Sequence, residues 1–440
     1  MPYFQSGESK GQANRGKKDT TLTTTLFHFG QRTGGGMDVL PYSRGETSLV
    51  FHSGRHFLQI PGPTNVPDRV LRAIDQPTID HRGPQFAELA GRCLAGMRWV
   101  YQTEHPVLIY PASGTGGWEA ALVNTLSPGD RVLAFDSGQF AALWTKAARN
   151  LSLNIELVDC DWRVGVEPDK VADRLAADRE HQIKAVMVVH SETSTGVAND
   201  ISAIRRAIDS TGHPALLMVD TVSSLAAMDY RHDEWRVDVA IGGSQKGMML
   251  PPGLAFNAIS PKALAASKTA KLPRSFWRWD EMLEFNSKGF FPYTPSTNLL
   301  FGLRESLSML AEEGLPNVYG RHLRFLEAAR RAVRAWGLEL APLECNRCST
   351  ALTAVMVPDG FNEAEIRAVI LQKFNLSLGA GLGKFAGRVF RIGHLGSFND
   401  LMLMGTLCGV EMGLSVAGVP HRNGGAAAAM EYLTEQARVD

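Results

Sequence analysis

The chain has 440 residues, of which 44% are hydrophobic and 20% are charged. This composition is ordinary for a globular protein with a large core, and we expect one large domain and one smaller domain. The formal net charge is zero, which gives no electrostatic reason to expect nucleic acid or an anionic membrane as a partner. Five cysteines are few and odd in number, so we expect a reducing compartment, the cytoplasm.

The first 53 residues are polar and contain no sustained apolar core of the kind that a secretory signal needs. We predict that residues 1–53 form a disordered extension, and Met37 offers an alternative start. Ordered sequence is expected from near Gly54 onward. The segment 61–67 contains three prolines, which remove backbone donors and restrict the residues before them, so it predicts a fixed loop.

Short apolar runs then alternate with helical patterns as far as residue 259. Continuous apolar runs are typical of strands that are covered on both faces, and alternation with helices is typical of a mostly parallel sheet. The sequence therefore predicts a large α/β domain over residues 54–300 with a seven-stranded sheet. The predicted strands are 107–110, 131–136, 154–158, 185–190, 215–220, 237–241 and 253–259, and the predicted helices are 118–126, 139–149, 168–178 and 201–211.

After residue 300 a long helical stretch leads into a smaller α+β domain, residues 301–440. Strands are predicted at 349–357 and 389–392, with a helix at 362–374 between them. The longest apolar stretch, residues 401–419, contains Glu411 and several glycines, so we interpret it as a buried helix and turn rather than a membrane span.

Ligands of α/β sheets bind at the carboxyl ends of the strands, and we expect four polar features there. The first is the segment 111–117, which follows a strand and opens a helix. Its small residues let backbone N–H groups approach an anion, and Ser113 and Thr115 can add hydroxyl donors beside Gly114. It lacks the spacing of a P-loop or a dinucleotide fingerprint. A plain glycine-rich turn with a helix cap is the alternative.

The other three features are single charged residues. Asp220 ends an apolar strand, where it serves either as a helix cap or as a partner for a protonated ring nitrogen. Lys246 lies among small residues ahead of a Pro-Pro turn; a desolvated amine there can form a Schiff base, although most lysines are solvated surface charges. Arg391 suits capture of a carboxylate, with a structural ion pair as the alternative.

These four features, in this order, resemble those of the pyridoxal-phosphate enzymes of fold type I. More narrowly, the chain resembles the class V aminotransferases, the branch that contains serine–glyoxylate and alanine–glyoxylate aminotransferases. The similarity runs from about Gln59 to Leu414. The segments that carry it are 61–65, 113–116, 190–197, 219–224, 243–247, 251–253, 293–295 and 391–393.

The resemblance implies pyridoxal 5′-phosphate as the cofactor and a homodimer with a shared active site. Lys246 would form the Schiff base and move the proton at the substrate, and Asp220 would keep the pyridine nitrogen protonated. One departure is Phe291, where a similar relative has a tyrosine. The other implied roles are phosphate binding by Ser113, Gly114, Thr115 and Gln245, cofactor contacts by Phe140, Thr193 and Val222, phosphate contact with the neighbouring subunit by Tyr293 and Thr294, and substrate binding by Thr64, Asn65 and Arg391.

The reaction that the resemblance implies is transfer of an amino group from serine to glyoxylate, giving hydroxypyruvate and glycine. Alanine and aspartate are alternative donors. A cysteine desulfurase is a further alternative, because Cys345 and Cys348 lie in the C-terminal region, but desulfurases carry histidines where this chain has Gln245 and Phe140. A catalytically silent cofactor-binding protein would not need the lysine. The two cysteines lack a second pair for zinc, and no metal is expected.

Overall fold

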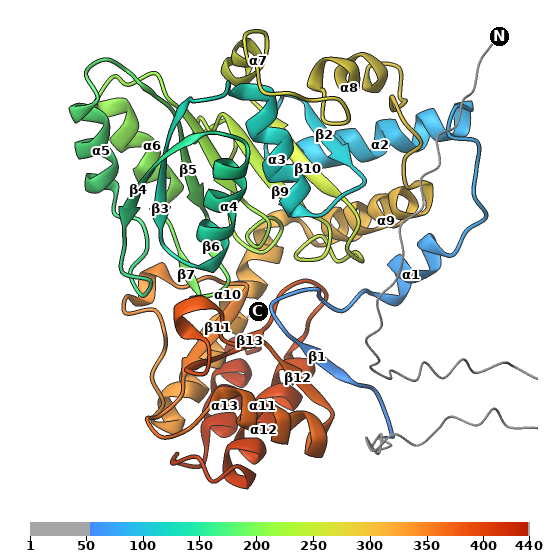
Figure 1. Ribbon diagram of the computed structural model, residues 1–440. Helices are drawn as coiled ribbons and strands as arrows, with labels where there is room; N and C mark the ends of the chain where they lie inside the picture. The colour runs from blue at the N-terminus through green and yellow to red at the C-terminus, as the bar shows by residue number, and fades with distance from the viewer. Residues whose placement is uncertain (1–52, 439–440) are drawn as a thin grey trace, which may run out of the picture. The chain divides into compact units, whose positions relative to one another are not determined.

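The computed structural model describes residues 53–438 (Figure 1). The extension predicted for residues 1–53 therefore lies outside the described residues, apart from Ser53. The main element is a seven-stranded sheet in the order β2-β10-β9-β8-β5-β3-β4. Strand β10 is antiparallel to both its neighbours and the other pairs are parallel, which confirms the mostly parallel α/β sheet. The strands are β2 (Val107–Tyr110), β3 (Arg131–Asp136), β4 (Asn154–Asp159), β5 (Ile183–Val189), β8 (Leu216–Asp220), β9 (Val239–Gly243) and β10 (Ala255–Ile259).

The apolar runs form strands because helices cover the sheet. Every residue of β2, β8, β9 and β10 is buried, as continuous apolar runs predict. A short antiparallel hairpin, β6 with β7, follows β5. The bounds of these elements and of the flanking helices are β6 (Ser191–Glu192), β7 (Val197–Ala198), α1 (Asp68–Ile74), α2 (Pro84–Tyr101), α3 (Gly114–Thr125), α4 (Gln139–Asn150), α5 (Pro168–Ala177), α6 (Ile201–Ser210), α7 (Pro261–Ser267), α8 (Trp279–Asn286) and α9 (Thr297–Glu313).

The C-terminal elements, orange to red in Figure 1, form a second α+β arrangement with its own hydrophobic cluster between Phe325 and Leu433. Strand β11 pairs antiparallel with β13, and β12 pairs parallel with β1. The domain boundary predicted at residue 300 stays a prediction. The bounds are β1 (Phe57–Gln59), α10 (Leu315–Trp336), the 3-10 turn Cys345–Arg347, β11 (Leu352–Met356), α11 (Glu363–Phe374), β12 (Leu376–Leu378), the 3-10 turn Gly383–Phe385, β13 (Val389–Gly393), α12 (Asp400–Val416) and α13 (Gly425–Gln436).

The apolar stretch 401–419 forms α12, as predicted, but only one side of this helix is buried. Leu403, Leu407 and Val410 are buried, whereas Leu401 and Val416 are 82% and 57% exposed. The helix lies at the surface because it packs on α11 and α13 from one side. Within residues 53–438, no helix is long and apolar enough to cross a membrane.

Candidate active site

A cavity of about 230 Å³ lies where β2, β5, β8 and β9 end. It collects nine of the residues predicted from the sequence, which come from segments up to 133 positions apart (Ser113 to Lys246). The sheet brings them together because parallel strands end at the same edge. The lining residues are Gly62, Pro63, Ser113, Gly114, Thr115, Trp118, Phe140, Val189, Ser191, Thr193, Asp220, Val222, Ser223, Gln245 and Lys246.

Lys246 follows β9 and is only 8% exposed. Its Nζ donates a hydrogen bond to the carbonyl oxygen of Pro61. Burial and, to a smaller extent, the nearby positive charge of Arg391 lower the pKa of Lys246 to about 8. Gly62 has φ +110°, and a Cβ at this position would overlap the Lys246 side chain, so a glycine is required. A buried amine with a lowered pKa is a competent nucleophile near neutral pH.

Asp220 is the last residue of β8 and is 3% exposed. Its Oδ1 accepts a hydrogen bond from the Val222 amide at 2.7 Å, and its Oδ2 accepts one from Trp118 Nε1 at 2.8 Å. Burial raises the pKa of Asp220 to about 6, against the effect of these hydrogen bonds. The carboxyl group is thus held in a fixed orientation at the cavity wall, where it can pair with a protonated nitrogen of a ligand. No local sequence pattern indicated that Trp118 orients this carboxyl group.

The predicted phosphate cradle is the N-terminus of α3. Ser113 occupies the N-cap, and Gly114 and Thr115 are the first helical residues, so their amides have no acceptor within the helix. A Cβ at Gly114 would lie 2.6 Å from Val222 Cγ2, so only a glycine fits there. Nearby, Gln245 Oε1 is buried and has no hydrogen-bond partner. The backbone amides at the start of α3 fit a phosphate, whereas the unpaired Gln245 oxygen, an acceptor, fits a donor group of a ligand.

Arg391 does not lie at the carboxyl end of a strand in the large sheet, and this part of the prediction is wrong. It is inside β13 of the C-terminal part, opposite Ala354 of β11. Its Nε donates to the Ala380 carbonyl at 2.7 Å and its Nη1 to the Thr193 carbonyl at 2.8 Å. Among the described residues it forms no ion pair, and its Nη2 makes no hydrogen bond. Burial lowers the pKa of Arg391 to about 10, which still leaves it charged at neutral pH.

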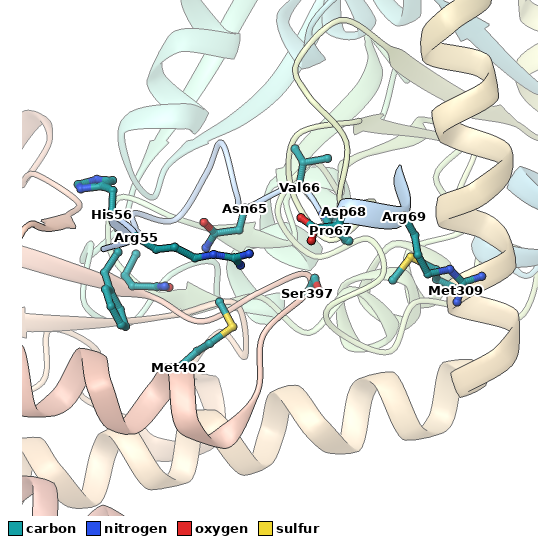
Figure 2. A pocket seen from close by; sticks show the side chains of 12 residues that line it. Arg55, His56, Asn65, Val66, Pro67, Asp68, Arg69, Met309, Ser397 and Met402 are labelled. Atoms are coloured by element: carbon teal, nitrogen blue, oxygen red, sulfur yellow. The ribbon is translucent and has the colours of Figure 1, made fainter. Parts of the chain in front are cut away.

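Thr64 and Asn65 do not line the cavity, in contrast to the prediction. Thr64 is buried, and its Oγ1 donates to the backbone carbonyl of Lys246 at 3.1 Å. Asn65 faces a different cavity of about 420 Å³, which Figure 2 shows with Arg55, Ser397 and Met402. Only the start of the loop, Gly62 and Pro63, lines the cavity. Substrate contact by these residues stays a prediction.

The segment predicted to reach a neighbouring subunit lies outside the cavity of its own chain. Tyr293 stacks on Phe276 with ring centroids 4.3 Å apart, and its hydroxyl group is buried without a partner. Thr294 is exposed. Phe291 is buried against Phe86, with ring centroids 6.0 Å apart. Contacts of Tyr293 and Thr294 with a second subunit stay predictions.

The features that distinguish a desulfurase are missing from the described part of the cavity. None of the described lining residues is a cysteine or a histidine. Cys348 forms an isolated β-bridge with Val197, and its Sγ donates a long hydrogen bond of 3.7 Å to the Glu344 carbonyl. The groups that meet at the cavity include the amine of Lys246, the carboxyl group of Asp220, the aromatic rings of Trp118 and Phe140, and the N-terminus of α3.

The fold is that of the fold type I pyridoxal-phosphate-dependent transferases. The sequence pattern of the family "Aminotransferase class-V" matches residues 56–382, and the chain belongs to this family. It is similar to serine–glyoxylate aminotransferase of Arabidopsis thaliana, with 47% identity over 87% of this chain and 96% of that protein. L-aspartate–glyoxylate aminotransferase of Paracoccus denitrificans is 45% identical over 86% of this chain and 96% of its own length. The structure of pyridoxamine–pyruvate aminotransferase from Mesorhizobium loti is similar with a TM-score of 0.81 and 27% identity, over 86% of this chain and 97% of that one.

Proposed function

We propose that this protein uses pyridoxal 5′-phosphate to transfer the amino group of serine to glyoxylate, which gives hydroxypyruvate and glycine. The observation that carries the proposal is that the buried amine of Lys246 and the buried carboxyl group of Asp220 face one cavity. The N-terminus of α3, at Ser113, opens onto the same cavity. The names of similar aminotransferases support serine and glyoxylate as the substrates.

The cofactor, when bound, supplies an electron sink for negative charge that develops at the substrate Cα. Lys246 holds the cofactor and then, as a base with a lowered pKa, moves the proton at that carbon. Asp220 keeps the ring nitrogen protonated. Arg391 has a free Nη2 that can orient the substrate carboxylate, which is a positioning effect. The remaining contacts are those of Ser113, Gly114, Thr115 and Gln245 with the phosphate, and of Phe140, Thr193 and Val222 with the ring.

The lining of the cavity favours a donor without a second carboxylate. Within the described part of the chain, Lys246 is the one cationic side chain in the lining, and Arg391 lies just behind Thr193. Aspartate would need a further cation for its β-carboxylate, whereas the hydroxyl group of serine needs only a hydrogen bond. Aspartate remains the second candidate because a similar protein is named for it.

The donor is tested with a panel of serine, alanine and aspartate against glyoxylate, with each keto acid quantified. We expect kcat/KM for serine, measured as hydroxypyruvate formed, to be at least about tenfold above that for alanine or aspartate. A tenfold ratio corresponds to a difference of about 1.4 kcal/mol in activation free energy. Faster formation of oxaloacetate would assign the protein to the aspartate-using group, and faster formation of pyruvate to the alanine-using group.

Cofactor attachment is tested by the visible absorbance of the purified protein before and after borohydride. We expect Lys246→Ala to abolish reductive trapping of pyridoxal phosphate on the protein. Lys268→Ala, which changes an exposed lysine at the end of α7, is the matched control and should leave trapping intact. Unchanged trapping in Lys246→Ala would show that another amine holds the cofactor.

We further propose a cytoplasmic homodimer in which the segment with Tyr293 and Thr294 reaches the partner's cofactor phosphate. The exposed position of Thr294, outside the cavity of its own chain, supports this arrangement. Free cysteines at positions 93, 160 and 408 support a reducing compartment. Light scattering tests the dimer, and fractionation of cells tests the location.

A further inference from the structure

Glu192 is a fully buried acid beside the cavity, and the proposed reaction gives it no role. It ends β6, between Ser191 and Thr193, which both line the cavity. Its own side chain points to the other side, because successive side chains of an extended segment alternate. An acid is very rarely buried unless its oxygens are paired, so its partners indicate what it does.

Both oxygens of Glu192 accept hydrogen bonds. Oε2 accepts from the amides of Phe140 and Ala141, each at 3.1 Å. Oε1 accepts from the Ser194 amide at 3.0 Å and from its hydroxyl group at 2.7 Å. The Ser194 Oγ in turn accepts from the Gln139 amide at 3.0 Å. Three amides of the first turn of α4, which have no acceptor within the helix, are therefore satisfied from the β6–β7 hairpin.

The start of α4 is built for this distant cap. Its N-cap residue is Gly138, which has no side chain that could accept these hydrogen bonds. A Cβ at Gly138 would overlap the Glu192 side chain, so the glycine makes room for the carboxyl group. The helix thus has no local cap and depends on Glu192 for the position of its first turn.

This anchor connects two walls of the cavity. Phe140 belongs to the first turn of α4 and lines the cavity. Thr193 also lines the cavity, and it lies between Glu192 and Ser194, which are hydrogen-bonded to each other. The Thr193 carbonyl also accepts the hydrogen bond from Arg391 Nη1. One carboxyl group therefore fixes the helix that carries Phe140 relative to the hairpin that carries Thr193 and holds Arg391.

We propose that Glu192 is a positioning residue: it holds Phe140 and the Thr193–Arg391 pair at a fixed separation and so sets the orientation of the cofactor ring and the substrate. This inference rests on the proposed function, because it assigns those walls to a cofactor and a substrate. The chain offers a matched control in Glu411, which caps α13 in the same way by accepting from the amides of Gly424 and Ala426, also behind a glycine N-cap.

The anchor itself is tested by hydrogen exchange of the cofactor-free protein. Glu192→Gln keeps the size of the side chain but can accept on one side only, so the amides of residues 139–141 should exchange at least about tenfold faster. Glu411→Gln should instead accelerate exchange near residue 425 and leave 139–141 unchanged. If Glu192→Gln does not fold, Ser194→Ala removes the hydroxyl bond to Glu192 Oε1 and the acceptor of the Gln139 amide, so the Gln139 amide should exchange at least about tenfold faster. Wild-type exchange at 139–141 in a folded variant would overturn the proposal.

The positioning role is tested by the circular dichroism of the bound cofactor and by steady-state kinetics. We expect Glu192→Gln to change the dichroic band of the cofactor and to raise KM for the amino donor about tenfold or more. Glu411→Gln should lower Tm but keep band and KM. If Glu192→Gln exchanges faster at residues 139–141 but keeps the wild-type dichroic band and the wild-type KM, Glu192 is only a structural helix cap and the positioning role is wrong. If the wild-type protein binds no cofactor and has no activity, the proposed function fails, while the exchange experiment still decides the anchor.

Discussion

At the residue scale, the chemistry of the cavity depends on burial of groups that are normally charged. Burial lowers the pKa of Lys246 to about 8 and raises the pKa of Asp220 to about 6. Both shifts bring the groups close to neutral pH, where a general base and a charge partner act efficiently. The shifts also have a thermodynamic consequence, because a group that is hard to ionise in the folded protein costs stability when it ionises.

Asp220→Asn should leave the cofactor bound but slow transamination. Loss of the negative charge removes the partner of the ring nitrogen, and an opposite charge at close range is worth about 1–3 pKa units, so we expect a tenfold to thousandfold lower kcat. Stopped-flow kinetics with serine measure this. Asp173→Asn, at an exposed position of α5, is the control and should be neutral. Wild-type turnover of Asp220→Asn would contradict the proposed role.

The pH dependence of stability should carry the signature of Lys246. The unfolded lysine titrates at its ordinary pKa of 10.5 and the folded one at about 8, so below pH 8 the folded protein pays the full cost of a buried charge. That cost disappears as pH rises from about 8 to 10.5. Lys246→Met should therefore stabilise the cofactor-free protein by on the order of 3 kcal/mol at pH 7, and by less at pH 10. Urea unfolding at both pH values measures this difference, and an equal gain at both would refute it.

At the scale of elements, glycines decide how closely helices and loops approach. In α12, a Cβ at Gly413 would overlap Ile370 of α11, so the two helices can pack only around a glycine. In α10, Gly320 is exposed and has nothing within 4 Å of its Cβ position. The same substitution should therefore have opposite effects at the two positions.

Gly413→Ala should lower the free energy of unfolding by about 1–3 kcal/mol, because the added methyl group overpacks the α11–α12 contact. Gly320→Ala should raise it by about 0.5–1 kcal/mol, because alanine loses less conformational entropy in a helix. Denaturant unfolding of both variants gives the two numbers. Changes of the same sign would show that the helix contact is looser than the structure has it.

At the scale of the whole molecule, the proposed dimer would complete the site. Within its own chain, the segment with Tyr293 and Thr294 does not line the cavity. The partner subunit would then supply these side chains to the phosphate, in the isologous arrangement of a two-fold dimer.

A shared site predicts complementation between two inactive variants. We expect Lys246→Ala and Tyr293→Ala to be strongly impaired when each is alone. After the two are unfolded and refolded together, half of the dimers are mixed and each mixed dimer has one intact site, so about a quarter of wild-type activity should return. Activity measured after each variant is refolded separately is the control. No recovery in the mixture would show that Tyr293 acts within its own chain.

The sequence predicted the sheet closely because the signal for a buried strand is local. The strands predicted at residues 107–110 and 131–136 are β2 and β3 without a shift, and the other five strands of the sheet differ by one or two residues at their ends. Helix α3 begins at Gly114, four residues before the predicted start at residue 118, because the glycines of this segment disfavour a helix in a prediction from sequence. The glycines lie at its N-terminus, where the unpaired amides that a phosphate would bind are found.

The sequence by itself determined the class of fold and the placement of Asp220 and Lys246 at strand ends. The spacing of apolar residues and the order of strands along the chain can both be recognised in short stretches of sequence. Only the tertiary structure decided how these residues are oriented. Trp118 binds Asp220 across 102 positions, and Arg391 reaches Thr193 across 198 from inside β13. Asn65 faces away from the cavity, and Glu192 caps a helix that lies before it in the chain. Such contacts follow from the packing of distant segments, which no local pattern encodes.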